Sequence, residues 1–338
     1  AAAAAPIRHI HVSDRGRFGF AHIDAAEQRV EALGYAVINR VLGDVLQRAL
    51  PRVAGLEQLC PARTVAVRMA ASHAEVSVDA GDGARTLTTR LLVAADGASS
   101  AVRDMLGIGA QRTDYAQTAV IGNLRTERSL DDCAYERFTP DGPLALLPIT
   151  EGRAAFIWTL APARARQVSE LTDDEFIAAL QDAFGLRLGR FARVGVRASY
   201  ALALTRAHAL VARRGVVIGN AAHGLHPVAA QGFNLGLRDV AALGECIADA
   251  RHDGTTDAGD AVLLERYADW RRSDQRNLVH FTDGLVRLFG SRRRSLRVLR
   301  DAGMLGFDLI PGIRGLLARH TMGLAGRLPR LSRGVPLA

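Results

Sequence analysis

The chain has 338 residues, of which 49% are apolar and 23% charged, a balance that excludes a wholly disordered protein and predicts about two domains. Its formal net charge is +8, and because it contains no lysine, all 43 basic residues are arginines. There is no run of about 18 apolar residues, and the five opening alanines lack a basic flank, so neither a transmembrane helix nor a signal peptide is predicted. The three scattered cysteines argue against a disulfide framework, and we expect no bound metal.

Hydrophobic periodicity and turn residues predict mixed α and β structure along the chain. The predicted elements are a strand over 7–12, a helix over 25–50, strands within 64–78 and 84–93, a strand-rich region over 115–160, a helix over 172–184, a strand over 216–219, a helix from Phe233 to about Ala250, and mostly helix beyond Leu263. The helix over 172–184 has a capping-box pattern, with Thr172 as the N-cap and Glu175 three residues later.

The first segment with a chemical signature follows the apolar run at 91–95. That run ends at Asp96-Gly97, and Ser100 and Arg103 come next. A strand that stops at such a turn and continues into a helix presents backbone N–H groups at its carboxyl end, where open α/β sheets bind ligands. An isolated Asp-Gly pair is more often only a turn, so this segment alone leaves both interpretations open.

The second segment covers residues 214–239. A strand ends at Gly219, a loop of small residues follows, and a helix begins near Asn234. Small residues allow backbone amides to approach a flat or anionic ligand, and the helix N-terminus adds partial positive charge. A plain strand–loop–helix connection would account for Gly219 and Gly232 but not for the whole string, so the segment indicates a ligand-binding site.

Together the two segments resemble the class A FAD-dependent aromatic hydroxylases, whose Asp-Gly motif is similar to 96–103 and whose Gly-Asp motif is similar to 219–236. The resemblance is nearest to the 2-octaprenyl-6-methoxyphenol hydroxylases of the ubiquinone-biosynthesis branch, through residues 7–16, 136–139, 142–145 and 282–286. It implies an α/β fold in which an FAD-binding Rossmann-like domain carries an inserted β-sheet substrate domain and a helical C-terminal tail. The implied parts are 1–112 and 205–270 for the FAD-binding domain, 113–204 for the substrate domain and 271–338 for the C-terminal helical region.

Two departures from the family pattern stand out. The Gly-Asp pair is Gly219-Asn220 here, which keeps a hydrogen-bonding oxygen but removes the charge. The chain also has no Gly-x-Gly-x-x-Gly fingerprint, which in this fold opens the first βαβ unit and binds the dinucleotide pyrophosphate. We therefore expect that the first βαβ unit is missing from these 338 residues; the alternative is a natural paralogue that binds no flavin.

The resemblance also implies an activity. The enzyme would be an NAD(P)H-dependent flavoprotein monooxygenase that hydroxylates a polyprenylated phenol in ubiquinone biosynthesis through a flavin hydroperoxide, with FAD as cofactor and NAD(P)H as cosubstrate. A flavin halogenase is not expected, because that chemistry relies on a lysine and the chain has none. The alternatives are the same enzyme class acting on a soluble aromatic compound, and a flavin-free scaffold in the ubiquinone-biosynthesis assembly.

Site residues follow from the same resemblance. Pro227 and Gly232 would form the loop beside the flavin ring, and no acid or base is assigned. The residues expected to bind FAD are Asp96, Gly97, Ser100, Arg103, Gly219, Asn220, Gln231, Gly232, Phe233 and Asn234, with Tyr35 and Arg40 beside the flavin unless they are a solvent-facing pair. The residues Tyr135, Phe138, Leu146, Phe156 and Trp158 would line the substrate pocket or form ordinary strand core.

The excess of positive charge lies at the C-terminal end. Residues 271–338 hold 14 arginines and four acidic residues, while the rest of the chain holds 29 arginines and 31 acidic residues. A basic cluster at 292–300 precedes an apolar stretch at 304–317, a combination that suits an anionic membrane surface or a ubiquinone-biosynthesis complex. The alternative is a solvated helical face. We expect no nucleic-acid partner and a cytoplasmic protein, either free or peripheral on the inner membrane.

Overall fold

The computed structural model describes residues 4–16, 20–81, 83–224, 231–290, 322 and 326–337, except for the side chains of 277–290. The chain divides into two compact units. The first comprises Ala1–Leu56, Tyr115–Leu202 and Arg287–Met322, and the second comprises Glu57–Asp114, Ala203–Val286 and Gly323–Ala338. Each unit is therefore assembled from segments that are distant in the sequence. The four-part division into 1–112, 113–204, 205–270 and 271–338 stays a prediction.

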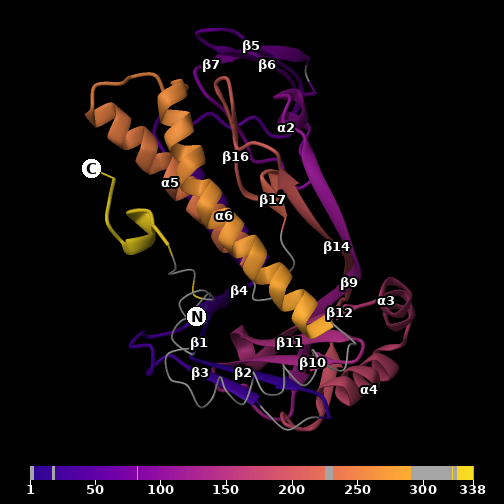
Figure 1. The fold of residues 1–338 in the computed structure, drawn as a ribbon. Helices are drawn as coiled ribbons and strands as arrows, with labels where there is room; N and C mark the ends of the chain where they lie inside the picture. Colours follow the sequence, from indigo (N-terminus) through magenta and orange to yellow (C-terminus); the bar gives the residue numbers. More distant parts are fainter. Residues whose placement is uncertain are drawn as a thin grey trace. The chain divides into compact units, whose positions relative to one another are not determined.

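The first unit is built on a mixed sheet (Figure 1). Its strands are β2 (His9–Asp14), β3 (Phe20–Asp24), β9 (Ala110–Thr126), β10 (Cys133–Thr139), β11 (Gly142–Ile149), β12 (Arg153–Leu160) and β13 (Phe191–Val194). They follow the order β9-β12-β11-β10-β2-β3, with β13 also paired to β9. All these neighbours are antiparallel except β10 and β2, which run parallel with Tyr135 opposite His11. The strand-rich region predicted over 115–160 is confirmed.

Helices α3 (Pro162–Ser169) and α4 (Asp173–Phe184) contribute to the core of this unit. The strand residues Leu146, Phe156 and Trp158 pack with helix residues of the same cluster and are at most 1% exposed. For these three residues the interpretation as ordinary strand core is the correct one. The capping box at the start of α4 is present: Thr172 N–H donates to Glu175 Oε2 at 3.0 Å, and Glu175 N–H donates to the Thr172 hydroxyl at 3.4 Å.

The helix predicted over 25–50 is wrong in its first half. Residues 25–33 form turns, β4 (Gly34–Val37) follows, and helix α1 covers only Asn39–Ala49, before the short 3-10 helix η1 (Leu50–Arg52). The reason is a long-range pairing, since β4 binds β1 (Ala4–Ile7) antiparallel, with Gly34 opposite Ile7. Asp24 also caps the first turn by accepting a hydrogen bond from Ala26 N–H at 2.8 Å. Tyr35 therefore lies on a strand rather than on a helix.

The second unit contains two small sheets and the two longest helices. Its elements are β5 (Arg63–Met69), β6 (Ala74–Asp79), β7 (Ala84–Thr89), β8 (Leu92–Ala94), α2 (Ala101–Met105), β14 (Ala198–Ala207, from Ala203 on), β15 (Val211–Ala212), β16 (Gly215–Val217), η3 (Gly219–Ala221), β17 (His223–Gly224), α5 (Gly232–His252), α6 (Ala261–Gly290) and η5 (Leu331–Arg333). Strands β5, β6 and β7 form an antiparallel sheet, whereas β16 lies between antiparallel β15 and parallel β8.

Helices α5 and α6 lie side by side (Figure 1), and their apolar faces share one core with β16. Val216, Val217, Ala242 and Tyr267 in this core are fully buried. The helix predicted from 233 to 250 is confirmed, and so is helix beyond Leu263 as far as Gly290. Residues 326–337 hold only the short 3-10 helix η5, so the prediction of helix almost to the end is wrong there.

The final segment is held in place by polar contacts rather than by helical hydrogen bonds. Pro329 and Pro336 cannot donate backbone hydrogen bonds, which disfavours a continuous helix. Trp270 Nε1 donates to Arg327 O at 3.0 Å, and Arg330 N–H donates to Glu245 Oε2 at 2.6 Å. Within the described part of the chain, no helix is both long and apolar enough to cross a membrane. The basic cluster at 292–300 lies outside the described residues.

Candidate functional site

Strands β8 and β16 bring the two chemically distinctive segments of the second unit together. The strands run parallel, with Ala94 opposite Val217, and Ile218 N–H donates to Ala94 O at 3.0 Å. Because both strands end at the same edge, the turn at Asp96-Gly97 and the loop at Gly219-Asn220 follow side by side. This is the carboxyl edge of the parallel pair, where α/β folds place their ligands.

The Asp-Gly turn is organised by the Asp96 carboxylate. Asp96 accepts a hydrogen bond from the Ser100 hydroxyl and another from Val102 N–H at 3.0 Å. Ser100 in turn caps α2 by accepting from Arg103 N–H at 2.9 Å. Partial burial would raise the pKa of Asp96, but the hydrogen bonds from Ser100 and from backbone N–H groups outweigh it, so the pKa lies below its usual value. The carboxylate therefore stays charged at neutral pH.

Arg103 joins the two segments. Its side chain is buried, and Nη1 donates to Ala98 O at 3.3 Å and to Ala221 O at 3.2 Å. The first carbonyl belongs to the Asp-Gly turn and the second to the 3-10 turn η3 that follows Gly219. A guanidinium carries several donors in a fixed plane, so one side chain can fix both backbones at once.

The backbone around this edge is open where glycines stand. Gly97 has a φ of +89° and Gly219 a φ of +57°, in the left-handed region that other residues rarely adopt. Apart from its chain neighbours and its own helix, a Cβ atom built on Gly97, Gly219 or Gly232 would meet no atom of the described residues within 4 Å. By contrast, α5 approaches the loop so closely that a Cβ on Gly236 would lie 3.4 Å from the Gly219 Cα. The free space beside the three glycines can admit a flat group against the backbone.

The remaining predicted residues of this segment differ in how exposed their side chains are. Gln231 is buried as the N-cap of α5 without a side-chain capping hydrogen bond, while Asn220, Phe233 and Asn234 are exposed. Pro227 lies outside the described residues. The structure thus brings together the Asp-Gly turn, Arg103, the Gly219-Asn220 loop and the start of α5.

Tyr35 and Arg40 belong to the first unit. Tyr35 on β4 is 56% exposed, and the exposed Arg40 at the start of α1 lies 3.8 Å from the Asp44 carboxylate. Their placement beside a flavin stays a prediction.

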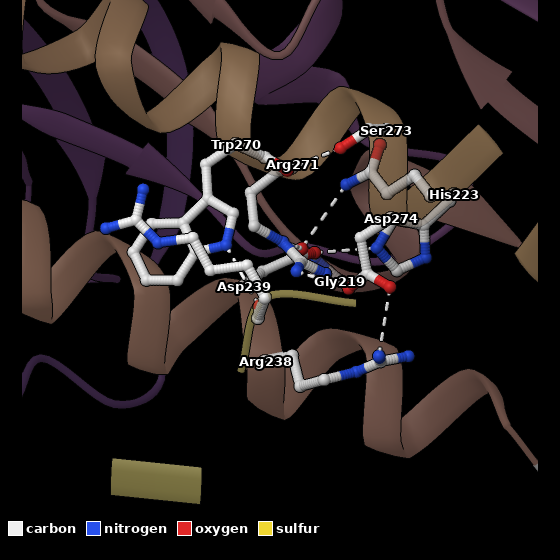
Figure 2. Close-up of polar contacts among 10 residues, drawn as sticks. Gly219, His223, Arg238, Asp239, Trp270, Arg271, Ser273 and Asp274 are labelled. Atoms are coloured by element: carbon white, nitrogen blue, oxygen red, sulfur yellow. Dashed lines mark hydrogen bonds and ion pairs between the residues drawn. The ribbon is translucent and has the colours of Figure 1, made fainter. Parts of the chain in front are cut away.

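The predicted site residues do not include a buried charge cluster that lies behind the loop (Figure 2). Its centre is Asp239 on α5, which is fully buried and pairs with Arg271 on α6, with Nε 2.7 Å from Asp239 Oδ1. Asp239 Oδ2 also accepts from Gly219 N–H at 3.0 Å and lies 2.6 Å from His223 Nε2. Burial would raise the pKa of Asp239, but the contacts with His223 and Arg271 hold it below its usual value. The sequence did hold one signal for this cluster: Asp239 is an acidic residue on the largely apolar helix that follows the small-residue loop.

The first unit has a separate cavity of about 300 Å³, lined by residues that include His11, His22, Tyr135 and Arg187. His11 is 2% exposed, its Nδ1 contacts His22 Nε2, and its Nε2 has no hydrogen-bond partner in the described structure. Burial, followed by repulsion from Arg187 and His22, lowers the pKa of His11 to about 4. The imidazole is therefore neutral at physiological pH.

This pKa predicts that His11 makes the protein sensitive to acid. The unfolded chain takes up a proton on His11 below about pH 6.5 while the folded protein does so only near pH 4, so stability falls as the pH drops between these values. The loss approaches about 3 kcal/mol for this shift. Urea unfolding between pH 7 and 4 should show a smaller decline for His11→Gln than for the unchanged protein. His208→Gln serves as the control, and equal declines for all three proteins would contradict the assignment.

Comparison with known proteins places these observations in a family. Residues 13–282 match the family model described as FAD binding domain. The chain is 39% identical over 335 residues to ubiquinone hydroxylase UbiL of Rhodospirillum rubrum, covering 98% of this chain and 77% of the relative. It is 33% identical over 308 residues to 3-demethoxyubiquinol 3-hydroxylase of Escherichia coli, covering 90% and 77%.

The fold is shared with solved structures of lower sequence identity. The crystal structure of p-nitrophenol 4-monooxygenase PnpA from Pseudomonas putida DLL-E4 matches with a TM-score of 0.78 at 17% identity, over 96% of this chain and 82% of that chain. The expected mixed α/β architecture is therefore confirmed.

Proposed function

This chain belongs to the FAD-dependent aromatic hydroxylases of ubiquinone biosynthesis, and on that premise we propose that it hydroxylates the ring of a polyprenylated phenol, with NAD(P)H as the reductant. The observation that carries the site assignment is the Arg103 bridge, because it holds both ligand-facing loops at one edge of the parallel strands. A soluble aromatic substrate is the alternative within the same enzyme class.

The residues at this edge fit FAD. Open space beside Gly97, Gly219 and Gly232 admits a flat ring system, and backbone N–H groups there can donate to its polar atoms. When bound, FAD supplies the activation of O₂ that no side chain can provide. The chain's own contribution is to bind and orient the cofactor and the phenol and to keep water out. Asn220 would offer a neutral hydrogen-bonding side chain where the wider family has Asp.

Two surfaces of the second unit support the proposal that a further βαβ unit completes the FAD cradle. Strand β8 is an edge strand of its three-stranded sheet among the described residues, so its outer side can accept a parallel neighbour. On α5, Phe233, Leu237 and Val240 form an apolar stripe at helical spacing, and each is more than half exposed. A βαβ unit with the glycine fingerprint would pair with β8 and cover this stripe.

This proposal predicts a difference in flavin content. The 338-residue chain should purify with little FAD, whereas a longer form that begins with a glycine-fingerprint βαβ unit should carry about one FAD per chain. Absorbance near 450 nm after gel filtration measures both forms. If the 338-residue chain holds FAD as firmly as the longer form, the cradle is complete without the additional unit.

The proposed reaction is tested with FAD-loaded enzyme, NADH or NADPH, and ¹⁸O₂. We expect one ¹⁸O atom in a polyprenylated phenol presented in anionic lipid vesicles, and much slower turnover of a short-chain soluble phenol. Preference for the soluble phenol would favour the alternative substrate class, and a colourless long form without turnover would favour the flavin-free scaffold. Comparing anionic with neutral vesicles tests the proposed membrane docking through the basic residues at 292–300. Equal turnover on the two kinds of vesicle would argue against that role.

Gly232 provides a test of the flavin position. A Cβ at 232 meets no neighbouring atom within 4 Å in the described part of the chain, so the fold should tolerate Gly232→Val with little change in melting temperature. The same side chain would occupy the space assigned to FAD, so flavin content should fall at least tenfold. Asn220→Asp is the matched variant that should keep its flavin. A yellow, active Gly232→Val enzyme would remove this space from the site.

A further inference from the structure

We propose that Asp239 is a positioning residue for the flavin loop: it holds the Gly219 amide and the His223 ring in the arrangement that receives the cofactor. The inference rests on the proposed FAD site. It assigns a role to a side chain behind the loop that contributes no surface of its own, since Asp239 is fully buried.

The Asp239 carboxylate is saturated with donors (Figure 2). Oδ2 accepts from Gly219 N–H at 3.0 Å and from His223 Nε2 at 2.6 Å, while Oδ1 accepts from Arg271 Nε at 2.7 Å and from Gln275 Nε2 at 3.3 Å. Two of these donors belong to the loop region and two to helix α6. One carboxylate on α5 thus ties the loop to both long helices.

The contact with His223 also fixes the protonation of the ring. A carboxylate only accepts hydrogen bonds, so the proton must reside on His223 Nε2. The other ring nitrogen, Nδ1, is buried and has no hydrogen-bond partner in the described part of the chain. His223 directly precedes Gly224, which ends the described part of the loop before α5. The carboxylate therefore determines which atom the ring can offer within the loop.

The charges around Asp239 are balanced inside the unit. Arg271, fully buried, also donates through Nη1 to Asp274 Oδ2 at 2.5 Å, and Asp274 Oδ1 accepts from Arg238 Nη1 at 3.0 Å. A buried charge that loses its partner is strongly destabilising. Asp274 is therefore a useful control, because it belongs to the same network and contacts Arg271, but none of its hydrogen bonds reaches Gly219 or His223.

The test compares Asp239→Asn with Asp274→Asn in the form of the enzyme that retains FAD. Both variants should melt at a lower temperature, since each removes one negative charge beside Arg271. Only Asp239→Asn should raise the FAD dissociation constant at least tenfold, measured by flavin fluorescence, with a change below threefold for Asp274→Asn. Equal increases in the two variants would overturn the proposal and leave Asp239 with a purely structural role.

A second variant guards against simple misfolding. In the double variant Asp239→Asn with Arg271→Met, both members of the buried pair are neutral, so stability should recover toward that of the unchanged enzyme. The loop contacts stay altered, so the FAD dissociation constant should stay at least tenfold raised. Recovery of FAD affinity together with stability would overturn the proposal.

The pH dependence of FAD binding gives a readout that a structural role would not move. The charged or titratable groups facing Asp239 are His223 from the loop, Arg271 and Tyr267 from α6, and, more remotely, Arg238 and Asp274. Burial would raise the pKa of Asp239, and the His223 contact is the largest of those that hold it down. His223→Leu should therefore make FAD dissociate at a higher pH than in the unchanged enzyme.

His223→Gln is the conservative control, because a glutamine amide can still donate to Asp239. It keeps the hydrogen bond to Asp239 but not the charge interaction, so it should shift the pH profile less than His223→Leu does. If His223→Leu leaves the profile unchanged, the proposal is contradicted. These experiments measure FAD affinity and not hydroxylation. Normal FAD binding without turnover of a prenylated phenol would thus refute the proposed substrate while leaving the role of Asp239 intact.

Discussion

The buried carboxylate of Asp239 constrains how the second unit can be assembled. An ion at 0% exposure is tolerated only if donors surround it, and these donors come from two segments of the chain: the loop region after β16, through Gly219 and His223, and helix α6, through Arg271. The side-by-side arrangement of α5 and α6 is thus determined by charge pairing as well as by apolar burial. The register of the helices follows, because Arg271 must face Asp239.

A second arginine, Arg103, also fixes the loop after β16. Arg103 contacts carbonyl oxygens of both turns, and the Asp239 carboxylate accepts a hydrogen bond from Gly219 N–H, so the loop after β16 is fixed by a guanidinium and by a carboxylate. The left-handed Gly219 in this loop leaves one side of the backbone without a side chain. Rigid support behind an open backbone is the arrangement expected where a cofactor must be oriented closely.

The sequence was informative where local chemistry decides the structure. The capping box at Thr172, the helix after Gly232 and the two motif turns each depend on neighbouring residues, so the sequence alone predicts them. The segment before α1 was predicted as helix because Val30, Leu33 and Val37 fit helical spacing, yet pairing with β1 decides its conformation. Asp239 and Arg271 are 32 residues apart and lie on two different helices, so no local sequence pattern predicts their contact. For strand residues such as Phe156, the sequence could not distinguish a pocket lining from ordinary core. Apolar alternation shows that one face of a strand is covered, but it does not show whether a ligand or another element covers that face.

The exposed stripe on α5 has a consequence for how the chain behaves in solution. Phe233, Leu237 and Val240 expose apolar side chains at helical spacing, more than half of each being accessible. At low ionic strength the net charge of +8 keeps copies of the chain apart by mutual repulsion. Salt shortens the range of that repulsion and strengthens the association of apolar surfaces. Added salt should therefore promote association of this chain, whereas it weakens an association that depends on surface ion pairs. We therefore expect the chain to stay dispersed more readily when it is concentrated in dilute buffer than in high salt.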